Sequence, residues 1–425
     1  MGEGDRVASN RPAQAIVAAQ RVGRAVARMP GIGILWAPPR AAGFAVDAFV
    51  KQRFRRGPDD VPKARPSLGL TAQVALDEAF LGMMRNPSRY PTDADYAGLA
   101  AELEAASDLY SERGWIADPR SYHRDPPPLD GLRVRRLWAM NVWYERLSWP
   151  SEYETYPGEP NAARWASYAK NRIAYAYVVR NEPDRPWVMC LHGFSTGYPM
   201  ADFFAFKAKR LSEQLGLNVV FPVLPLHGPR RASRMSGAEL LSYNVLDFII
   251  GMGQAMWDIR RLLGWLRGQG AERIGVHGMS LGAYTGGLLA ALEPGLDFLV
   301  AGAPLCDMPG LIDHHMPRRL RGKAQEIGVD QDVLRQVFRP VSPLAYGSHL
   351  PSERLHMYAG VGDRMSTPEQ AHRLWAHWDR PNVLWYDGGH ISFLWSGEVV
   401  RFMDEVLATA GYIDRAAPAI SQPPV

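Results

Sequence analysis

The fold is indicated by the stretch RIGVHGMSLGAYTGG, residues 273–287. It begins with a short apolar run typical of a buried strand and ends in small residues typical of a closely packed helix. Between them, Gly278-Met279-Ser280-Leu281-Gly282 matches G-x-S-x-G, whose glycines permit a sharp strand-to-helix turn that exposes the serine hydroxyl. The stretch therefore predicts a strand, a nucleophilic serine and a helix in direct succession.

Short apolar runs of the same kind recur on both sides of this stretch. They lie at residues 187–191, 218–223, 273–276, 296–301, 354–358 and 382–385. Helical windows separate them, at 200–215, 243–267, 281–292, 368–378 and 395–409. Residues 133–146 and 171–180 alternate between polar and apolar residues like half-buried strands. Alternating strands and helices predict an α/β fold with a doubly wound, mostly parallel sheet.

The length of 425 residues accommodates one large domain with additions. Residues 70–113 have helical periodicity with a break at Asn86-Pro87, so we expect residues 1–120 to form an N-terminal helical extension. This extension is expected to act either as a cap or as a membrane-facing element. The prolines at 126–128 mark a boundary, after which we expect the main domain at 121–415, a short cap insertion at 306–350 and a flexible tail at 416–425.

Composition excludes several classes of protein. Apolar residues make up 47% and charged residues 22%, which argues against a disordered chain and a polytopic membrane protein. The net charge is +4 and the two signs are interspersed, so we expect no nucleic-acid partner. The two cysteines have no ligand-like spacing, which argues against a disulfide framework and a structural zinc site. We expect no metal or organic cofactor.

The first residues bear on location. Residues 1–10 are polar and lack a secretory pattern, which favours the cytoplasm. Residues 13–50 are richer in apolar groups but are interrupted by prolines and charges, so they do not read as a membrane span. Packing onto the protein body is the favoured interpretation, with a peripheral membrane contact as the alternative.

A second G-x-S-x-G match occurs at Gly193-Phe194-Ser195-Thr196-Gly197. Ser195 follows an earlier strand run, a place where enzymes with such open sheets put an oxyanion-hole donor. Three apolar runs follow Ser280, which leaves room for an acid and a histidine further along the chain. We therefore favour Ser280 as the nucleophile, with Ser195 as the rival.

A serine hydroxyl needs a general base that is oriented by a third group. His390 follows the last predicted strand behind two glycines, which form a loop able to carry the imidazole over the sheet edge. Asp363 follows the 354–358 run in a glycine-containing turn and is the favoured acid. Asp307, after the 296–301 run, is the alternative acid.

Taken together, these motifs resemble the α/β-hydrolase superfamily over roughly residues 130–410. The resemblance rests on His192-Gly193-Phe194, the Ser280 motif, Gly362-Asp363 and Gly389-His390, which occur in the family's order. It implies Ser280 as nucleophile, Asp363 as acid and His390 as base, with an oxyanion hole formed by the backbone N–H groups of Phe194 and Leu281.

A further turn, Gly228-Pro229-Arg230-Arg231, is similar to one in the dienelactone-hydrolase-like and prolyl-oligopeptidase-like branches rather than in lipases. The resemblance implies a serine hydrolase that cleaves a carboxylic ester, either of a small molecule or of a lipid-like substrate, through an acyl-enzyme. An acyltransferase or a peptidase would use the same triad. A non-catalytic binding or membrane-scaffold protein is the alternative from another class. The substrate, its acyl chain length and the oligomeric state are left open.

Overall fold

The structure is a computed structural model that describes residues 37–54, 61–84 and 90–414. The tail predicted at 416–425, the break at Asn86-Pro87 and most of the apolar stretch 13–50 lie outside the described residues.

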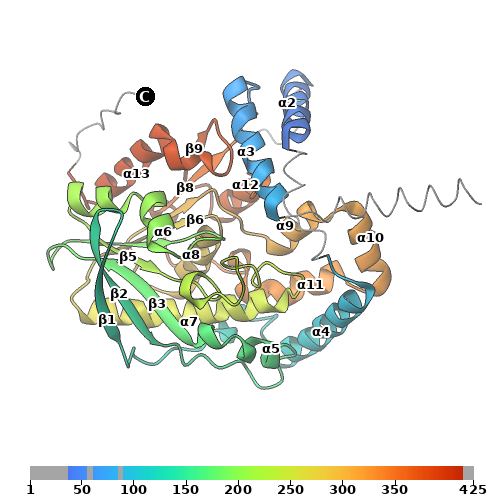
Figure 1. Cartoon of the computed structure of the whole chain (residues 1–425), viewed down its shortest axis with the longest axis horizontal. Coiled ribbons are helices and arrows are strands. Elements are labelled where there is room, and N and C mark those ends of the chain that lie inside the picture. Colours follow the sequence, from blue (N-terminus) through green and yellow to red (C-terminus); the bar gives the residue numbers. More distant parts are fainter. Residues whose placement is uncertain (1–36, 55–60, 85–89, 415–425) are drawn as a thin grey trace, which may run out of the picture.

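A nine-stranded sheet forms the centre of the molecule, in the order β1-β2-β3-β5-β4-β6-β7-β8-β9 (Figure 1). Neighbours from β1 to β5 pair antiparallel, and all pairs from β5-β4 to β8-β9 are parallel. This is the mostly parallel sheet expected from the sequence, and the chain has the α/β-hydrolase fold. The strands are β1 (Arg133–Ala139), β2 (Val142–Pro150), β3 (Ile173–Val179), β4 (Trp187–Leu191), β5 (Asn218–Pro222), β6 (Ile274–Met279), β7 (Leu299–Gly302), β8 (Leu355–Gly360) and β9 (Asn382–Tyr386).

The alternating residues 133–146 form a hairpin rather than one strand. Met140 and Asn141 connect β1 to β2 and have φ values of 52° and 59°. Two successive left-handed residues are the backbone of a type I′ turn, whose twist matches that of the flanking strands.

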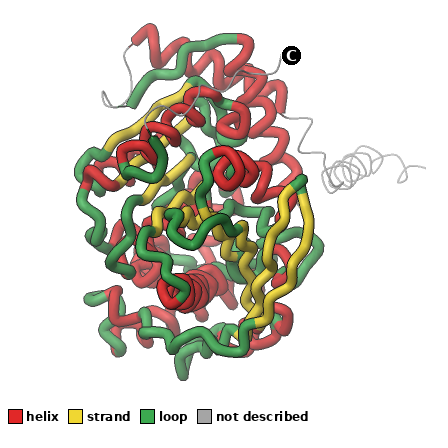
Figure 2. Tube along the Cα trace, turned by 90° about the vertical axis from the view of Figure 1, so that its left-hand side faces the viewer, coloured by secondary structure: helices red, strands yellow, loops and turns green. Residues whose placement is uncertain are grey.

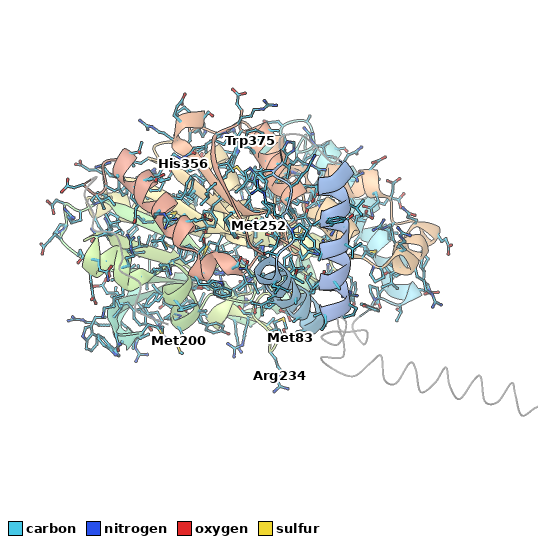
Figure 3. The ribbon with its side chains drawn as sticks, turned by 90° about the horizontal axis from the view of Figure 1, so that it is seen from above. Met83, Met200, Arg234, Met252, His356 and Trp375 are labelled. Carbon is cyan, nitrogen blue, oxygen red and sulfur yellow. The ribbon has the colours of Figure 1, made fainter. Side chains whose placement is uncertain are left out.

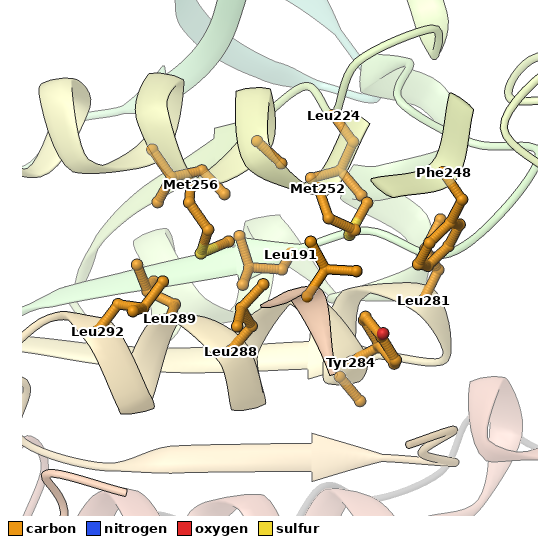
Figure 4. Packing of buried hydrophobic residues seen from close by; sticks show 14 of the residues in the cluster. Leu191, Leu224, Phe248, Met252, Met256, Leu281, Tyr284, Leu288, Leu289 and Leu292 are labelled. Carbon is orange, nitrogen blue, oxygen red and sulfur yellow. The ribbon is translucent and has the colours of Figure 1, made fainter. Parts of the chain in front are cut away.

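Helices cover both faces of the sheet (Figures 1 and 2). Side chains of β4 alternate between two buried clusters, so that Met189 and Leu191 lie in one and Val188 and Cys190 in the other. Figure 4 shows the first cluster where it is filled by the facing sides of α7 and α8. Apart from those of the insertion at 306–350, the α-helices after β4 are α6 (Pro199–Ala205), α7 (Leu246–Gly268), α8 (Leu281–Leu292), α12 (Pro368–His377) and α13 (Gly397–Thr409).

The predicted helix at 200–215 is shorter in the structure. The α-helix α6 ends at Ala205, and a separate π-helical turn spans Arg210–Gln214. Lys207 lies between them with φ 54°, a left-handed conformation that an α-helix does not accommodate.

The insertion at 306–350 contains three helices, α9 (Met308–His315), α10 (Arg318–Ile327) and α11 (Gln331–Phe338). The N-terminal part contributes α2 (Ala37–Phe54), α3 (Leu68–Met84) and α4 (Asp93–Glu112), and the short α5 (Ala162–Ser167) follows β2.

The N-terminal helices divide into two parts. The apolar face of α4 joins the main buried cluster, and α4 packs against α10 and α11. In contrast, α2 and α3 pack on each other (Figures 1 and 3) and lie at the top of Figure 1, beside the elements that follow β8 and β9. The residues expected to form one extension therefore cover two separate places on the protein.

Across 37–54, 61–84 and 90–414, none of the helices has both the length and the apolar character needed to traverse a membrane.

Candidate active site

Ser280 lies between β6 and α8 with φ 56° and ψ −116°. A non-glycine residue rarely adopts this region, and backbone strain of this kind is concentrated at functional sites. The flanking Gly278 and Gly282 are required, because a Cβ on either would overlap backbone atoms of the turn or of the end of β4. The Ser280 N–H donates to the Gly302 carbonyl at 2.8 Å, which fixes the turn to β7.

The predicted oxyanion-hole residues are Leu281 and Phe194. Leu281 is the first residue of α8, so its N–H has no partner within the helix. Gly193 lies against the turn, since a Cβ built on it would be 3.5 Å from Ser280 Cβ. Phe194 is the next residue. Both predicted oxyanion-hole residues are thus chain neighbours of residues at this turn: Leu281 follows Ser280, and Phe194 follows Gly193.

The structure brings Asp363 and His390 together. His390 Nδ1 lies 2.7 Å from Asp363 Oδ2, and both residues are buried, with 5% and 4% of their surface exposed. Asp363 Oδ1 accepts the backbone N–H groups of Met365 and Ser366, each at 2.8 Å, so the acid is held on both oxygens.

The pKa of His390 reflects opposing effects. Burial lowers it, but the charge of Asp363, the hydrogen bond to Asp363 and the charge of Asp77 raise it, and the net pKa lies above the ordinary value for histidine. An imidazole bound to a carboxylate through Nδ1 leaves Nε2 available for proton transfer.

Sheet topology places these residues at one edge. Ser280 follows β6, Asp363 follows β8 and His390 follows β9, and these strands run parallel in one sheet. Their carboxyl ends therefore meet at the same edge. Among the hydrogen bonds of the described residues, none joins the Ser280 hydroxyl to His390, a contact that is often long when no substrate is bound.

The rival residues have other contacts. Asp307 caps α9 by accepting the Gly310 N–H at 3.0 Å and pairs with Arg373, so the structure brings Asp363 rather than Asp307 to His390. Ser195 has φ 69° but lies inside the loop between β4 and α6, not at a direct strand-to-helix junction.

Two other strand-end histidines have structural contacts. His192 Nε2 accepts the Leu224 N–H at 3.0 Å, and His277 Nε2 lies 3.0 Å from the Tyr358 hydroxyl. Burial lowers the pKa of His192 to about 4 and that of His277 to about 3, so both are neutral at pH 7.

The predicted glycine-arginine turn holds a fully buried guanidinium. Arg230 lies 2.8 Å from Asp258 of α7 and donates to the carbonyls of Val223 and Asn171, each at 3.0 Å. Arg230 therefore anchors the loop after β5 to α7.

The sequence interpretation missed Asp77 and Glu78 on α3. Asp77 is 1% exposed and accepts the His390 N–H at 2.6 Å, while Glu78 is 3% exposed and pairs with Arg364 at 3.1 Å. A sequence signal for both exists, because the buried stripe of α3 consists of Leu70, Val74, Asp77, Glu78, Leu81 and Gly82. Two acids on an apolar helix stripe indicate buried partners.

No group of three or more His, Cys, Asp or Glu side chains within the described part of the chain is arranged to hold a metal ion.

Two curated relatives come from Mycobacterium tuberculosis. The uncharacterized protein MT2702 (strain CDC 1551 / Oshkosh) is 38% identical over 379 residues, which span 86% of this chain and 89% of that protein. The uncharacterized protein Rv2627c (strain ATCC 25618 / H37Rv) has the same identity and coverage. The chain belongs to their family. No family model matches the sequence.

Similar solved structures include three hydrolases. The acetyl xylan esterase from Paenibacillus sp. R4 has 15% identity and a TM-score of 0.47, over 76% of this chain and 97% of that chain. A Mycobacterium tuberculosis puromycin-hydrolyzing peptidase has 16% identity and a TM-score of 0.40, over 69% and 41%. The 2-hydroxy-6-oxo-6-phenylhexa-2,4-dienoate hydrolase from Rhodococcus sp. strain RHA1 has 16% identity and a TM-score of 0.39, over 66% and 99%.

Proposed function

We propose that this protein is a serine hydrolase that cleaves a carboxylic ester of a small or lipid-like substrate. Ser280 is the nucleophile, His390 the general base and Asp363 the acid that orients it. The observation that carries the proposal is the strained strand-to-helix turn at Ser280, at the same sheet edge as the buried Asp363–His390 pair. Ser280 can adopt this conformation because Gly278 and Gly282 on either side of it lack a Cβ atom.

The chemistry follows from the geometry. The Ser280 oxygen attacks the ester carbonyl while His390 Nε2 takes its proton, and Asp363 stabilises the resulting imidazolium through Nδ1. The developing oxyanion accepts hydrogen bonds from the N–H groups of Phe194 and Leu281. The Leu281 N–H also lies at the positive end of the α8 dipole. His390 returns its proton to the leaving alcohol, and water then releases the acid from Ser280.

The test is covalent labelling with a fluorophosphonate probe. We expect the wild-type protein to be labelled and the Ser280→Ala variant to be unlabelled. Ser195→Ala is the matched control from the second motif and should retain labelling. Labelling of Ser280→Ala at the wild-type rate would refute Ser280 as the nucleophile.

The reaction class is tested on p-nitrophenyl esters of increasing acyl length, with the p-nitroanilides of the same acids alongside. We expect turnover of the esters to exceed that of the anilides, and the loss of both in Ser280→Ala. Turnover of anilides alone would favour the peptidase, and transfer of the acyl group to an added alcohol in preference to water would favour the acyltransferase.

A further inference from the structure

Helix α3 reaches the loops that carry two of the proposed catalytic residues, and it does so with a carboxylate. Asp77 Oδ2 accepts the backbone N–H of His390 at 2.6 Å and that of Arg364 at 3.2 Å. Asp77 Oδ1 accepts the N–H of Ile391 at 3.3 Å. One buried side chain thereby joins the loop after β8 to the loop after β9.

Glu78, the next residue, continues this contact. Its two oxygens pair with Arg364 at 3.1 Å and with Arg40 of α2 at 3.5 Å. The Arg364 guanidinium also lies 5.6 Å from the centre of the Phe44 ring of α2. Both helices of the N-terminal pair are therefore attached to the residue that follows Asp363.

Two glycines in the catalytic loops leave room for α3. A Cβ on Gly389 would lie 2.7 Å from Asp77 Oδ2, and a Cβ on Gly362 would lie 2.7 Å from Leu70 Cδ1 and 3.2 Å from Val74 Cγ2. Neither glycine has a left-handed φ, so the backbone alone does not require glycine there. Close approach of α3 is the physical reason for both.

We propose that Asp77 is a positioning residue for the hydrolase: it locks the Asp363 loop to the His390 loop and adds a second negative charge beside the catalytic imidazole. The N-terminal pair α2–α3 is then an integral part of the catalytic centre, and its removal disables the enzyme rather than changing its substrate. This inference rests on the proposed function.

The titratable and charged groups that face Asp77 determine whether it is ionised and so how it changes the pKa of His390. They are Asp363 and Arg364 from the loop after β8, Tyr386 and His390 from β9 and its loop, and Glu78 on α3 itself. Burial, followed by the charge of Asp363, raises the pKa of Asp77 to about 6, against the lowering effect of His390 and the backbone donors, so Asp77 is ionised above that pH. Its charge then favours protonated His390.

The experiment compares Asp77→Asn, Asp77→Ala and the exposed control Asp108→Asn of α4 in the full-length protein. Asparagine keeps an oxygen for the His390 and Arg364 N–H groups but removes the charge. We expect the acid limb of the pH profile of Ser280 labelling to move to lower pH by about 1 unit in Asp77→Asn. This is the low end of the pKa change that an opposite charge within about 4–6 Å produces. Asp77→Ala should lose at least tenfold in kcat with little change in KM.

A merely structural role for Asp77 would leave the acid limb unmoved. An acid limb of Asp77→Asn that coincides with those of the wild type and Asp108→Asn would overturn the proposal. A titration of His390 by NMR in wild type and Asp77→Asn provides a readout that needs no turnover, and equal pKa values would also overturn it. Labelling that persists in Ser280→Ala would instead refute the proposed function, so the two failures are distinguishable.

Discussion

Gly389→Ala tests whether α3 is seated against the histidine loop. The added Cβ would lie 2.7 Å from Asp77 Oδ2 and 3.0 Å from Asp77 Cγ, whereas ordinary contacts begin at 3.4 Å. Helix α3 or the loop must therefore move by about 0.7 Å (3.4 − 2.7). The Asp77 carboxylate cannot rotate away without losing its bonds to the His390 and Arg364 N–H groups.

Overpacking of this kind costs about 1–3 kcal/mol of unfolding free energy. Displacement of the His390 loop should also slow fluorophosphonate labelling by roughly 10- to 100-fold, because catalysis is sensitive to shifts near 1 Å. Urea unfolding and labelling rates measure the two effects. The control is Gly98→Ala on the exposed face of α4, where a Cβ meets no atom within 4 Å, so that alanine should stabilise the helix by about 0.5–1 kcal/mol.

The double variant Asp77→Ala/Gly389→Ala completes the test. Removing the carboxylate gives the added Cβ its space, so the two substitutions should be less than additive by at least about 1 kcal/mol. A Gly389→Ala protein with wild-type stability and wild-type labelling would show that α3 does not sit where the structure places it.

Two further predictions concern buried charges elsewhere in the fold. Arg230→Met should cost about 3–5 kcal/mol of unfolding free energy, because it leaves the Asp258 carboxylate buried without its ion-pair partner. Arg230→Met/Asp258→Leu should recover most of that loss in urea unfolding, and an equally unstable double variant would contradict this. Burial raises the pKa of Glu159 to about 7, so the folded state holds a proton that the unfolded state loses above about 4.5, and stability falls as pH rises between these values. Glu159→Gln should therefore gain stability over wild type from pH 5 to pH 8, by up to about 3 kcal/mol, and a gain that does not vary with pH would refute the assignment.

Much of the sheet could be predicted because its central strands are buried on both faces. Trp187–Leu191 is an unbroken apolar run in the sequence and a fully buried strand in the structure. Glycines after such runs predict Asp363 and His390 as site residues, and the structure joins these two side chains. Their distance in sequence did not matter, because parallel strands bring their carboxyl ends to one edge.

Features that depend on long-range contacts were not predictable in the same way. The helical periodicity of α3 places the Asp77 carboxylate on the apolar stripe of the helix. Its partner, His390, lies 313 residues away, and no local sequence pattern identifies it. The turn at Met140-Asn141 lacks the glycine that usually marks a type I′ hairpin. Helix α10 is mostly polar, and its apolar row of Leu320, Ala324 and Ile327 does not show that it packs against α4.

The docking of α3 also affects how the protein is made. Helix α3 is synthesised before the His390 loop to which it binds, and that loop follows 313 residues later. At about 5–20 residues per second, α3 remains without the His390 loop for roughly 15–60 s. During that time, the acids and apolar residues of α3 that are buried in the folded protein are accessible to chaperones and proteases. A nascent or truncated chain that ends before β9 therefore lacks the contacts that join α3 to the loops of Asp363 and His390, and the proposed active site can form only after the His390 loop has been translated.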